Sequence, residues 1–334
     1  MNPNSGRESE IDNKNQNNVH FDCDNDGFEK KPKPLTFNND YKLPFFAYGI
    51  FKPRQLAFSR IEKFIDYEKT SKRSRDIHYK MITRDGVPLI EDKEDKRYYT
   101  QGYLIYFKKG HEKRAYDIIS NTQRRALYNW KEIEVDGIKS NVLVGLHLER
   151  GIPGNEFAID VFRGERDPLF SFAMKKIGKT VKEIENGKKT IPNIQNFFNI
   201  QQNYMLLWSA IERYASLKYD INKDERVQLA REYSDIFKNV IEEHVDEERV
   251  VYNSETLWCN RLDPDNSVGS MFYYYTVRCN IVHNGKEFQF RDFDLLLESL
   301  VELYKIFKQV LEKTFSNKKT IWYCYDKFIF LSRK

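Results

Sequence analysis

The spacing of apolar residues changes once along this chain, close to Asp167. Before that point apolar residues cluster or alternate over short runs, as in QGYLIYF at 101–107, which is typical of β-strands. After it they recur about every 3.6 residues, as expected for helices with one apolar face. A run of strands followed by a run of helices indicates an α+β fold in two parts. We therefore expect one domain at residues 41–168 and a helical domain at residues 169–334.

The first of these domains is expected to be built mainly from strands. A short helix fits HEKRAYDIIS at 111–120. The charged stretch at 67–97 predicts a long loop, in which VPLI could add a strand. The expected strands lie at 43–50, 101–107, 130–135, 141–148 and 157–162.

Four amphipathic helices are expected in the second domain, and four such helices predict a bundle. The first two carry apolar stripes over 200–215 and 229–241. The third is expected to begin at Ser267, a good N-cap, and to end at Asn284-Gly285, where glycine can take the left-handed conformation. The fourth is expected to begin at Asp292. The apolar run IWYCYDKFIFL near the end of the chain fits either a strand or a helix.

The charge of the chain is unevenly distributed. Its 55 Lys and Arg exceed its 50 Asp and Glu, for a net charge of +5. The first 40 residues hold 5 of the basic and 8 of the acidic residues, so the basic excess lies beyond them. That first stretch is polar and lacks apolar periodicity, which predicts a disordered tail at 1–40. The basic excess of the rest suits a polyanionic partner such as RNA, and equally a mixed solvated surface.

No part of the chain indicates a membrane, a metal or a cofactor. A run of about 18 apolar residues, which a membrane span needs, is absent from the sequence. The N-terminus resembles neither a secretory signal nor a transit peptide, so we expect a cytoplasmic protein. The four cysteines are scattered and form no C-x-x-C pair, which argues against a zinc site and against a disulfide framework.

The run FFAYGIFKP at 45–53 is an apolar stretch that leads into a Tyr-Gly pair and a Lys-Pro turn. It resembles the opening strand and substrate loop of the γ-glutamylcyclotransferase-like (AIG2-like) family. The strands QGYLIYF and YNWKEIEV resemble later strands of that family. The resemblance implies a small mixed β-barrel, in which backbone amides of the loop would hold a carboxylate. The implied ligand-binding residues are Tyr48, Gly49, Ile50, Phe51 and Tyr128.

The chain departs from that family where the catalytic acid is expected. The family's glutamate would fall at 120–123, but SNTQ at those positions contains no carboxylate that could act as a general base. Asp117 and Glu132 are the alternative acids. We therefore expect this domain to bind or sense a small molecule or a protein. Cyclisation of γ-glutamyl peptides with release of 5-oxoproline is the alternative activity.

A second motif, RCNIVHNG, places Arg278 and His283 near the end of the third expected helix. Metal-free RNA cleavage by the ribose 2′-OH needs a group that moves protons near neutral pH and a cation beside the phosphate. Histidine titrates in that range, and arginine binds phosphate through two parallel hydrogen bonds. Five positions on an ideal helix leave the two residues about 140° apart, so the long arginine side chain must swing toward the histidine.

The Arg-x4-His spacing and the order of the helices resemble the HEPN family. Its ribonuclease members carry this motif at the end of the third helix of a four-helix bundle. The resemblance covers residues 195 to about 316, although Cys279 follows the arginine here and the polar Asn280 comes one position later. It implies a homodimer through the HEPN domain, in which two Arg-His pairs share one cleft, with Arg278 and His283 as catalytic residues. Asn280 would orient the imidazole or bind phosphate.

The same residues also have structural explanations. A histidine at a helix C-terminus is stabilised as a cation by the helix dipole, by about 0.3–1 kcal/mol. Arg278 could form an ion pair with Glu212 of the first helix, which would also position the arginine for catalysis. The three tyrosines at 273–275 could stack on RNA bases or fill the core. His244 is expected to be a solvated residue at a helix end.

The sequence therefore predicts a metal-independent endoribonuclease, a toxin or antiviral defence effector regulated by its N-terminal domain. Two alternatives stay open. One is an enzyme of the γ-glutamylcyclotransferase type. The other is a non-catalytic dimer that binds RNA or protein.

Overall fold

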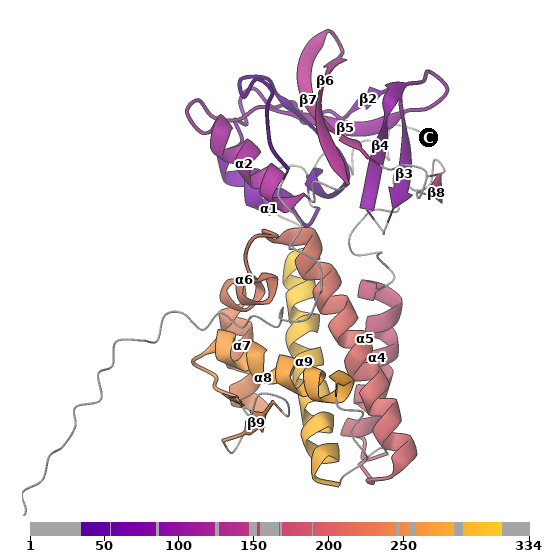
Figure 1. Cartoon of the computed structure of the whole chain (residues 1–334), viewed down its shortest axis with the longest axis vertical. Helices are drawn as coiled ribbons and strands as arrows, with labels where there is room; N and C mark the ends of the chain where they lie inside the picture. Colours follow the sequence, from indigo (N-terminus) through magenta and orange to yellow (C-terminus); the bar gives the residue numbers. More distant parts are fainter. Residues whose placement is uncertain are drawn as a thin grey trace, which may run out of the picture.

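The structure, a computed structural model, has a strand-rich N-terminal part (residues 35–153) above a helical part (residues 167–315), as Figure 1 shows. The content is α+β, as the change of hydrophobic period predicts. The expected strand at 157–162 and the apolar run near the C-terminus lie outside the described residues. The structure describes 35–53, 55–84, 87–123, 127–146, 152–153, 167, 169–188, 190–244, 248–253, 258–283 and 290–315.

A mixed five-stranded sheet curls into a half-barrel in the N-terminal part (Figure 1). The short central strand β1 is antiparallel to β5 on one side and parallel to β7 on the other. Helix α2 (Glu112–Thr122) packs over the sheet, close to the expected helix. The strands, in spatial order, are β2 (Arg75–Ile77), β5 (Thr100–Ile105), β1 (Phe45–Ala47), β7 (Ile138–Gly145) and β6 (Tyr128–Val135).

The sequence predicted a long loop at 67–97, but the structure has strands there. This charged stretch forms β2 and the hairpin of β3 (Tyr79–Arg84) and β4 (Val87–Glu94), with the short β8 (Ile152–Pro153) beside β3. The first half of β4, VPLI, is buried, whereas its charged second half is exposed. Charged residues therefore extend an ordered strand pair into solvent, a pattern that hydrophobic alternation does not reveal.

The core beneath the sheet is aromatic and includes a segment that was expected to be disordered. Phe37 stacks on Tyr116 of α2 at 4.2 Å between ring centroids, and Trp130 meets Tyr116 edge to face at 5.5 Å. Leu35 and Phe37 are both buried. Residues 35–40, which the sequence placed in the tail, therefore belong to the folded N-terminal part. A single pair of apolar residues is too short to give a periodic signal.

The helical part contains the predicted helices and several further elements. Helix α4 was not predicted, although its buried positions follow helical spacing. The second predicted helix is two helices, α6 and α7, which meet at Tyr233. The part is also not purely helical, since a hairpin of β9 (Val250–Tyr252) and β10 (Cys259–Arg261) precedes α8. The helices are α4 (Met174–Glu185), α5 (Ile194–Lys218), α6 (Glu225–Glu232), α7 (Ser234–His244), α8 (Ser267–His283) and α9 (Phe290–Phe315).

A polar cluster holds the end of the helical part that faces the N-terminal part. The ammonium of the buried Lys218, on α5, donates to the hydroxyls of Tyr214 and Tyr233 at 3.1 and 2.8 Å. It also pairs with the Glu232 carboxylate at 2.6 Å. The Tyr214 hydroxyl bonds to Thr314 near the end of α9 at 2.7 Å. A buried ammonium with its donors satisfied costs far less than an unpaired one, so these contacts join α5, α6 and α9 at this end.

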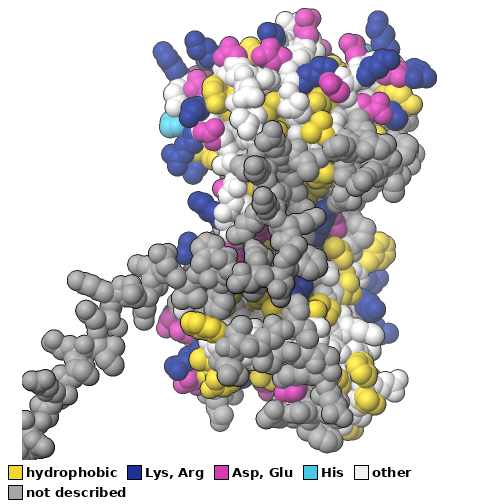
Figure 2. All heavy atoms as spheres, in the orientation of Figure 1, with side chains coloured by type: hydrophobic (Ala, Val, Ile, Leu, Met, Phe, Trp, Pro, Cys, Tyr) yellow, Lys and Arg dark blue, Asp and Glu magenta, His cyan; other side chains and the backbone are white. Residues whose placement is uncertain are grey.

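No helix in the described ranges is both long and apolar enough to cross a membrane. The charged side chains visible on the outer end of the N-terminal part are of both signs, as Figure 2 shows. This face of the molecule therefore offers a mixed surface there rather than a patch of one charge.

Candidate functional site

Helix α8 carries the second motif of the sequence analysis. It spans Ser267–His283, as predicted, but its cap lies one residue earlier than expected. The side-chain oxygen of Asn266 accepts from the Gly269 N–H at 2.8 Å, which is the hydrogen bond of an N-cap. Asn284-Gly285, the expected end of the helix, lies outside the described residues. The helix thus presents Arg278 and His283 within its last two turns.

Arg278 lies between an acidic and an aromatic side chain. Its Nη2 is 3.6 Å from Glu212 Oε1 of α5, and its guanidinium is 5.5 Å from the ring centroid of Tyr275. The Arg226 guanidinium lies over the same ring at 3.8 Å, while it pairs with Asp224. The Glu212 pairing that the sequence suggested is therefore present. Since the Glu212 side chain is 47% exposed, the pair orients the arginine without binding it tightly.

His283 is the last described residue of α8. Its backbone lies five positions after Arg278, so ideal helix geometry puts the two residues about 140° apart around the axis. The imidazole itself lies outside what the structure describes, as do the residues that follow it. The catalytic role of His283 therefore stays a prediction.

Asn280 connects α8 to the hairpin. Its side chain is buried, and its Nδ2 donates to the backbone carbonyl of Tyr252 in β9 at 2.8 Å. A second amide, that of Asn260 in β10, donates to the Thr276 hydroxyl of α8 at 2.8 Å. These two bonds fix the hairpin on the helix. The structure thus gives Asn280 a structural contact, and its predicted assistance in catalysis stays a prediction.

The tyrosines at 273–275 have different environments. Tyr273 and Tyr274 are fully buried, and the Tyr274 hydroxyl donates to the buried carboxylate of Glu302 at 3.0 Å. They fill the core and cannot stack on RNA in this conformation. Tyr275 is half-buried, between Trp208 of α5 and the two arginines described above. Burial raises the pKa of all three phenols.

His244 is not the solvated residue that the sequence suggested. Its Nδ1 lies 2.9 Å from the Val240 carbonyl, and its Nε2 lies 2.6 Å from the Lys305 ammonium of α9. A carbonyl requires a proton on Nδ1, and an ammonium requires a lone pair on Nε2. His244 therefore links α7 to α9 through these two contacts.

The residues that the first resemblance implies as ligand-binding, Tyr48, Gly49, Ile50, Phe51 and Tyr128, are all buried. The Tyr48 hydroxyl donates to the Leu143 carbonyl of β7 at 2.8 Å, and the Tyr128 hydroxyl donates to the Pro88 carbonyl of β4 at 3.1 Å. Burial raises the pKa of both phenols. Ile50 and Phe51 belong to the same core. These contacts tie the loop to the strands, and the predicted ligand pocket around these residues stays a prediction.

Gly49 satisfies two requirements of that loop. Its φ is +57°, a conformation that other residues rarely adopt. A Cβ at this position would also meet Pro88 Cγ at 2.5 Å. Glycine is therefore explained here by backbone conformation and close packing, without reference to a ligand.

The acids considered for γ-glutamyl cyclisation lie in surface ion pairs. Asp117 is 4.0 Å from Lys113, and Glu132 is 2.6 Å from Lys139. At the position of the family's acid, Ser120 Oγ accepts from the Trp130 indole at 3.2 Å, and Thr122 accepts from Arg60 at 3.2 Å. These polar groups thus have structural partners.

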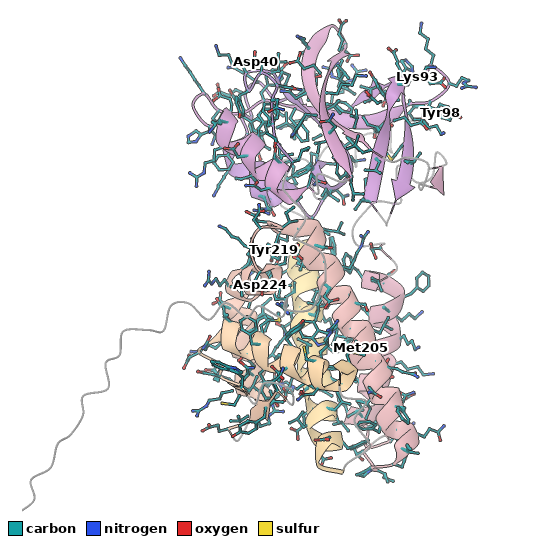
Figure 3. The ribbon with its side chains drawn as sticks, in the orientation of Figure 1. Asp40, Lys93, Tyr98, Met205, Tyr219 and Asp224 are labelled. Atoms are coloured by element: carbon teal, nitrogen blue, oxygen red, sulfur yellow. The ribbon has the colours of Figure 1, made fainter. Side chains whose placement is uncertain are left out.

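The N-terminal part contacts the helical part at the C-terminal end of α5. Arg60 donates to Thr122 of α2 and to the backbone carbonyl of Lys218, each at 3.2 Å. The last carbonyls of a helix have no partner within it, so an arginine is favourable at this end. Burial lowers the pKa of Arg60, and the nearby Asp220 opposes that effect. Figure 3 places Tyr219, the residue after Lys218, at this boundary.

Among the cavities at the surface of the described residues, two lie near residues discussed above. The larger, of about 420 Å³, lies between β9, α5, α8 and α9 and includes Asn280 in its lining. The smaller, of about 140 Å³, lies beside α2 and is lined in part by Lys42, Lys69 and Lys109. In the part of the chain that the structure describes, no three His, Cys, Asp or Glu residues gather as a metal site would require. The described cysteines, Cys259 and Cys279, are not joined in a disulfide.

Comparison with known proteins found no relative of this chain. The chain matches no family model, no curated protein sequence and no solved structure.

Proposed function

We propose that this protein is a metal-independent endoribonuclease of the HEPN type, in which Arg278 and His283 carry the chemistry. His283 accepts the proton of a ribose 2′-OH as that oxygen attacks the neighbouring phosphorus. Arg278 stabilises the negative charge that develops on the phosphate oxygens. The bond from phosphorus to the 5′ oxygen breaks, which leaves a 2′,3′-cyclic phosphate and a 5′-hydroxyl. By its resemblance, the protein acts as a toxin or antiviral defence effector.

The observation that carries this proposal is the setting of Arg278 in the last two turns of α8. The guanidinium lies 3.6 Å from a half-exposed carboxylate, and His283 follows on the same helix five positions later. A weak partner can orient an arginine and still leave it able to bind phosphate, whereas a fully buried pair would not.

The proposal includes a homodimer through the helical part. One arginine and one histidine supply few groups for a reaction that needs both a base and an acid. Two such pairs across a two-fold axis supply both, because the partner subunit's His283 can donate a proton to the leaving 5′ oxygen.

Glu212 should position Arg278, so Glu212→Gln should lower the rate of RNA cleavage. An ion pair at the surface is worth about 1 kcal/mol or less, which corresponds to a loss of about fivefold or less in kcat/KM. Glu242→Gln is the matched control, because Glu242 pairs with Lys238 at the same 3.6 Å on another helix face. A faster Glu212→Gln enzyme would show that the carboxylate competes with the phosphate instead.

The N-terminal part is proposed to regulate the nuclease through α5. Arg60 contacts the end of the helix that also carries Glu212. Arg60→Met should therefore lower the cleavage rate by no more than Glu212→Gln does, and the double variant should be no slower than Glu212→Gln alone. The control is Arg73→Met, because Arg73 is exposed, and this variant should cleave at the wild-type rate. If the rate losses of the two single variants multiply in the double variant, Arg60 and Glu212 act independently, and the proposed regulation through α5 is wrong.

Expression in cells tests the proposed function as a whole. Wild-type protein should arrest growth and create new RNA ends, whereas His283→Ala should do neither. If 5-oxoproline is instead formed from γ-glutamyl peptides, and His283→Ala leaves that activity unchanged, the protein is an enzyme of the cyclotransferase type. If Arg278→Ala and His283→Ala both leave growth arrest intact, the helical part only binds.

A further inference from the structure

The larger cavity lies on the same end of α8 as the proposed catalytic pair. Three of its lining residues, Val277, Asn280 and Ile281, belong to the last turns of that helix. His283 follows Asn280 by three residues, so its backbone lies about 4.5 Å further along the axis and on the same side of the helix. A ligand in this cavity would therefore lie next to the proposed site.

The cavity has the size and lining of a site for a small ligand. Its volume of about 420 Å³ is at the lower end of the range for ligand pockets, which is about 300–1,000 Å³. Aliphatic side chains of α8 and α9, among them Val277 and Leu296, form much of its wall. Gln201, Asn280 and Asp292 are its polar lining residues, each from a different helix.

The polar groups favour a base over a phosphate. Asp292 brings a carboxylate, which repels phosphate but accepts hydrogen bonds from the amino group of a base. Gln201 brings a carboxamide, which can both donate and accept along the edge of a base. Among the described residues that line the cavity there is no lysine or arginine. The ligand class that fits is thus a neutral, planar group with N–H donors on an apolar body.

Tyr252 offers a surface on which such a ligand can stack. It lines the cavity, yet 63% of the residue is exposed. Its backbone is held by Asn280, and the hairpin is held again by Asn260, so the ring is presented on a fixed support. Unpaired bases are commonly held by stacking on aromatic rings presented in this way.

We propose that the cavity between β9, α5, α8 and α9 binds one base of the RNA substrate next to the bond that is cut. Tyr252 stacks on the base, and Gln201 and Asp292 read its edge. Asn280 then acts as a positioning residue, because it fixes the wall that carries Tyr252. This inference rests on the proposed ribonuclease function. It assigns the choice of the cleaved bond to the base that binds in the cavity.

The test separates base recognition from cleavage. Wild-type enzyme is given a pool of random-sequence RNA, and the cut ends are sequenced; one base should be preferred at one position beside the cut. Asp292→Asn should reduce or change that preference by about fivefold or more, whereas the exposed Asp294→Asn should not. Tyr252→Ala should raise KM about tenfold, with Tyr99→Ala, an exposed tyrosine elsewhere, as its control.

Binding of a single-stranded RNA oligonucleotide is measured in parallel by fluorescence anisotropy. Cleavage without base preference, with KM unchanged in Tyr252→Ala, would overturn this inference and leave the nuclease proposal standing. Binding that Tyr252→Ala weakens, in a protein that cuts no RNA, would support the cavity as a base site and overturn the nuclease proposal. No binding and no cleavage would overturn both.

Discussion

Replacing His283 with alanine should lower the rate of RNA cleavage by about 10²–10⁴-fold, the usual contribution of one general acid or base. Arg278→Ala should cost about 10²-fold or more, because charge stabilisation at the phosphate is lost. Arg278→Lys should restore part of that loss, since lysine keeps the charge but not the paired hydrogen bonds. The measurement is single-turnover cleavage of an end-labelled RNA.

The control for this pair is His78→Ala, an exposed histidine of the N-terminal part. It should cleave at the wild-type rate. Mixing Arg278→Ala with His283→Ala should restore part of the activity, because a mixed dimer keeps one histidine as the base and one arginine in the shared cleft but lacks the second histidine that donates a proton to the 5′ oxygen. A His283→Ala protein that folds and cleaves normally would exclude the histidine from the chemistry. Mixtures without recovery would exclude the shared cleft.

Glu302→Ala should destabilise the helical part by about 3 kcal/mol, at the lower end of the usual cost of breaking a buried ion pair. Glu302 is buried on α9, where it pairs with Arg249 and accepts from the Tyr274 hydroxyl at 3.0 Å. Burial raises the pKa of Glu302, and Arg249 opposes that effect. Removing the carboxylate leaves a largely buried arginine and a buried phenol short of a partner.

The comparison for this variant is Glu298→Ala. Glu298 pairs with the same Arg249 at 2.8 Å, but its side chain is 50% exposed, so its loss should cost about 1 kcal/mol or less. Urea unfolding followed by circular dichroism measures both. Equal losses of stability in the two variants would show that Glu302 contributes no more than a surface partner.

The periodic elements of the fold could be predicted from the sequence. Helices α5, α8 and α9 each repeat apolar residues over many turns, and β5, β6 and β7 cluster them over strand lengths. Elements with little period were missed, apart from the VPLI run, which the sequence offered as a strand and which forms the first half of β4. The hairpin strands β9 and β10 have three residues each, and the second half of β4 is charged and largely exposed. These strands are held in place by contacts with residues distant in sequence, such as the hydrogen bond from Asn280 to the Tyr252 carbonyl.

The residues of the candidate site could be proposed from the sequence, whereas their surroundings could not. The spacing of Arg278 and His283 and the partner Glu212 follow from residue types and helix geometry. Which tyrosines are buried does not, because Tyr273 and Tyr275 are two positions apart on one helix and face different neighbours. The cavity beside the motif requires four elements to converge, and no local pattern in the sequence describes that convergence.

The chemistry of the RNA ends formed in EDTA tests the central claim most directly. Purified protein is incubated with RNA while divalent metals are chelated, and the products are analysed by mass spectrometry. A histidine and an arginine acting on the 2′-OH predict cleavage under these conditions, with 2′,3′-cyclic phosphates and 5′-hydroxyls at the new ends. Cleavage that requires a divalent metal, or that leaves 3′-hydroxyl ends, would contradict the account.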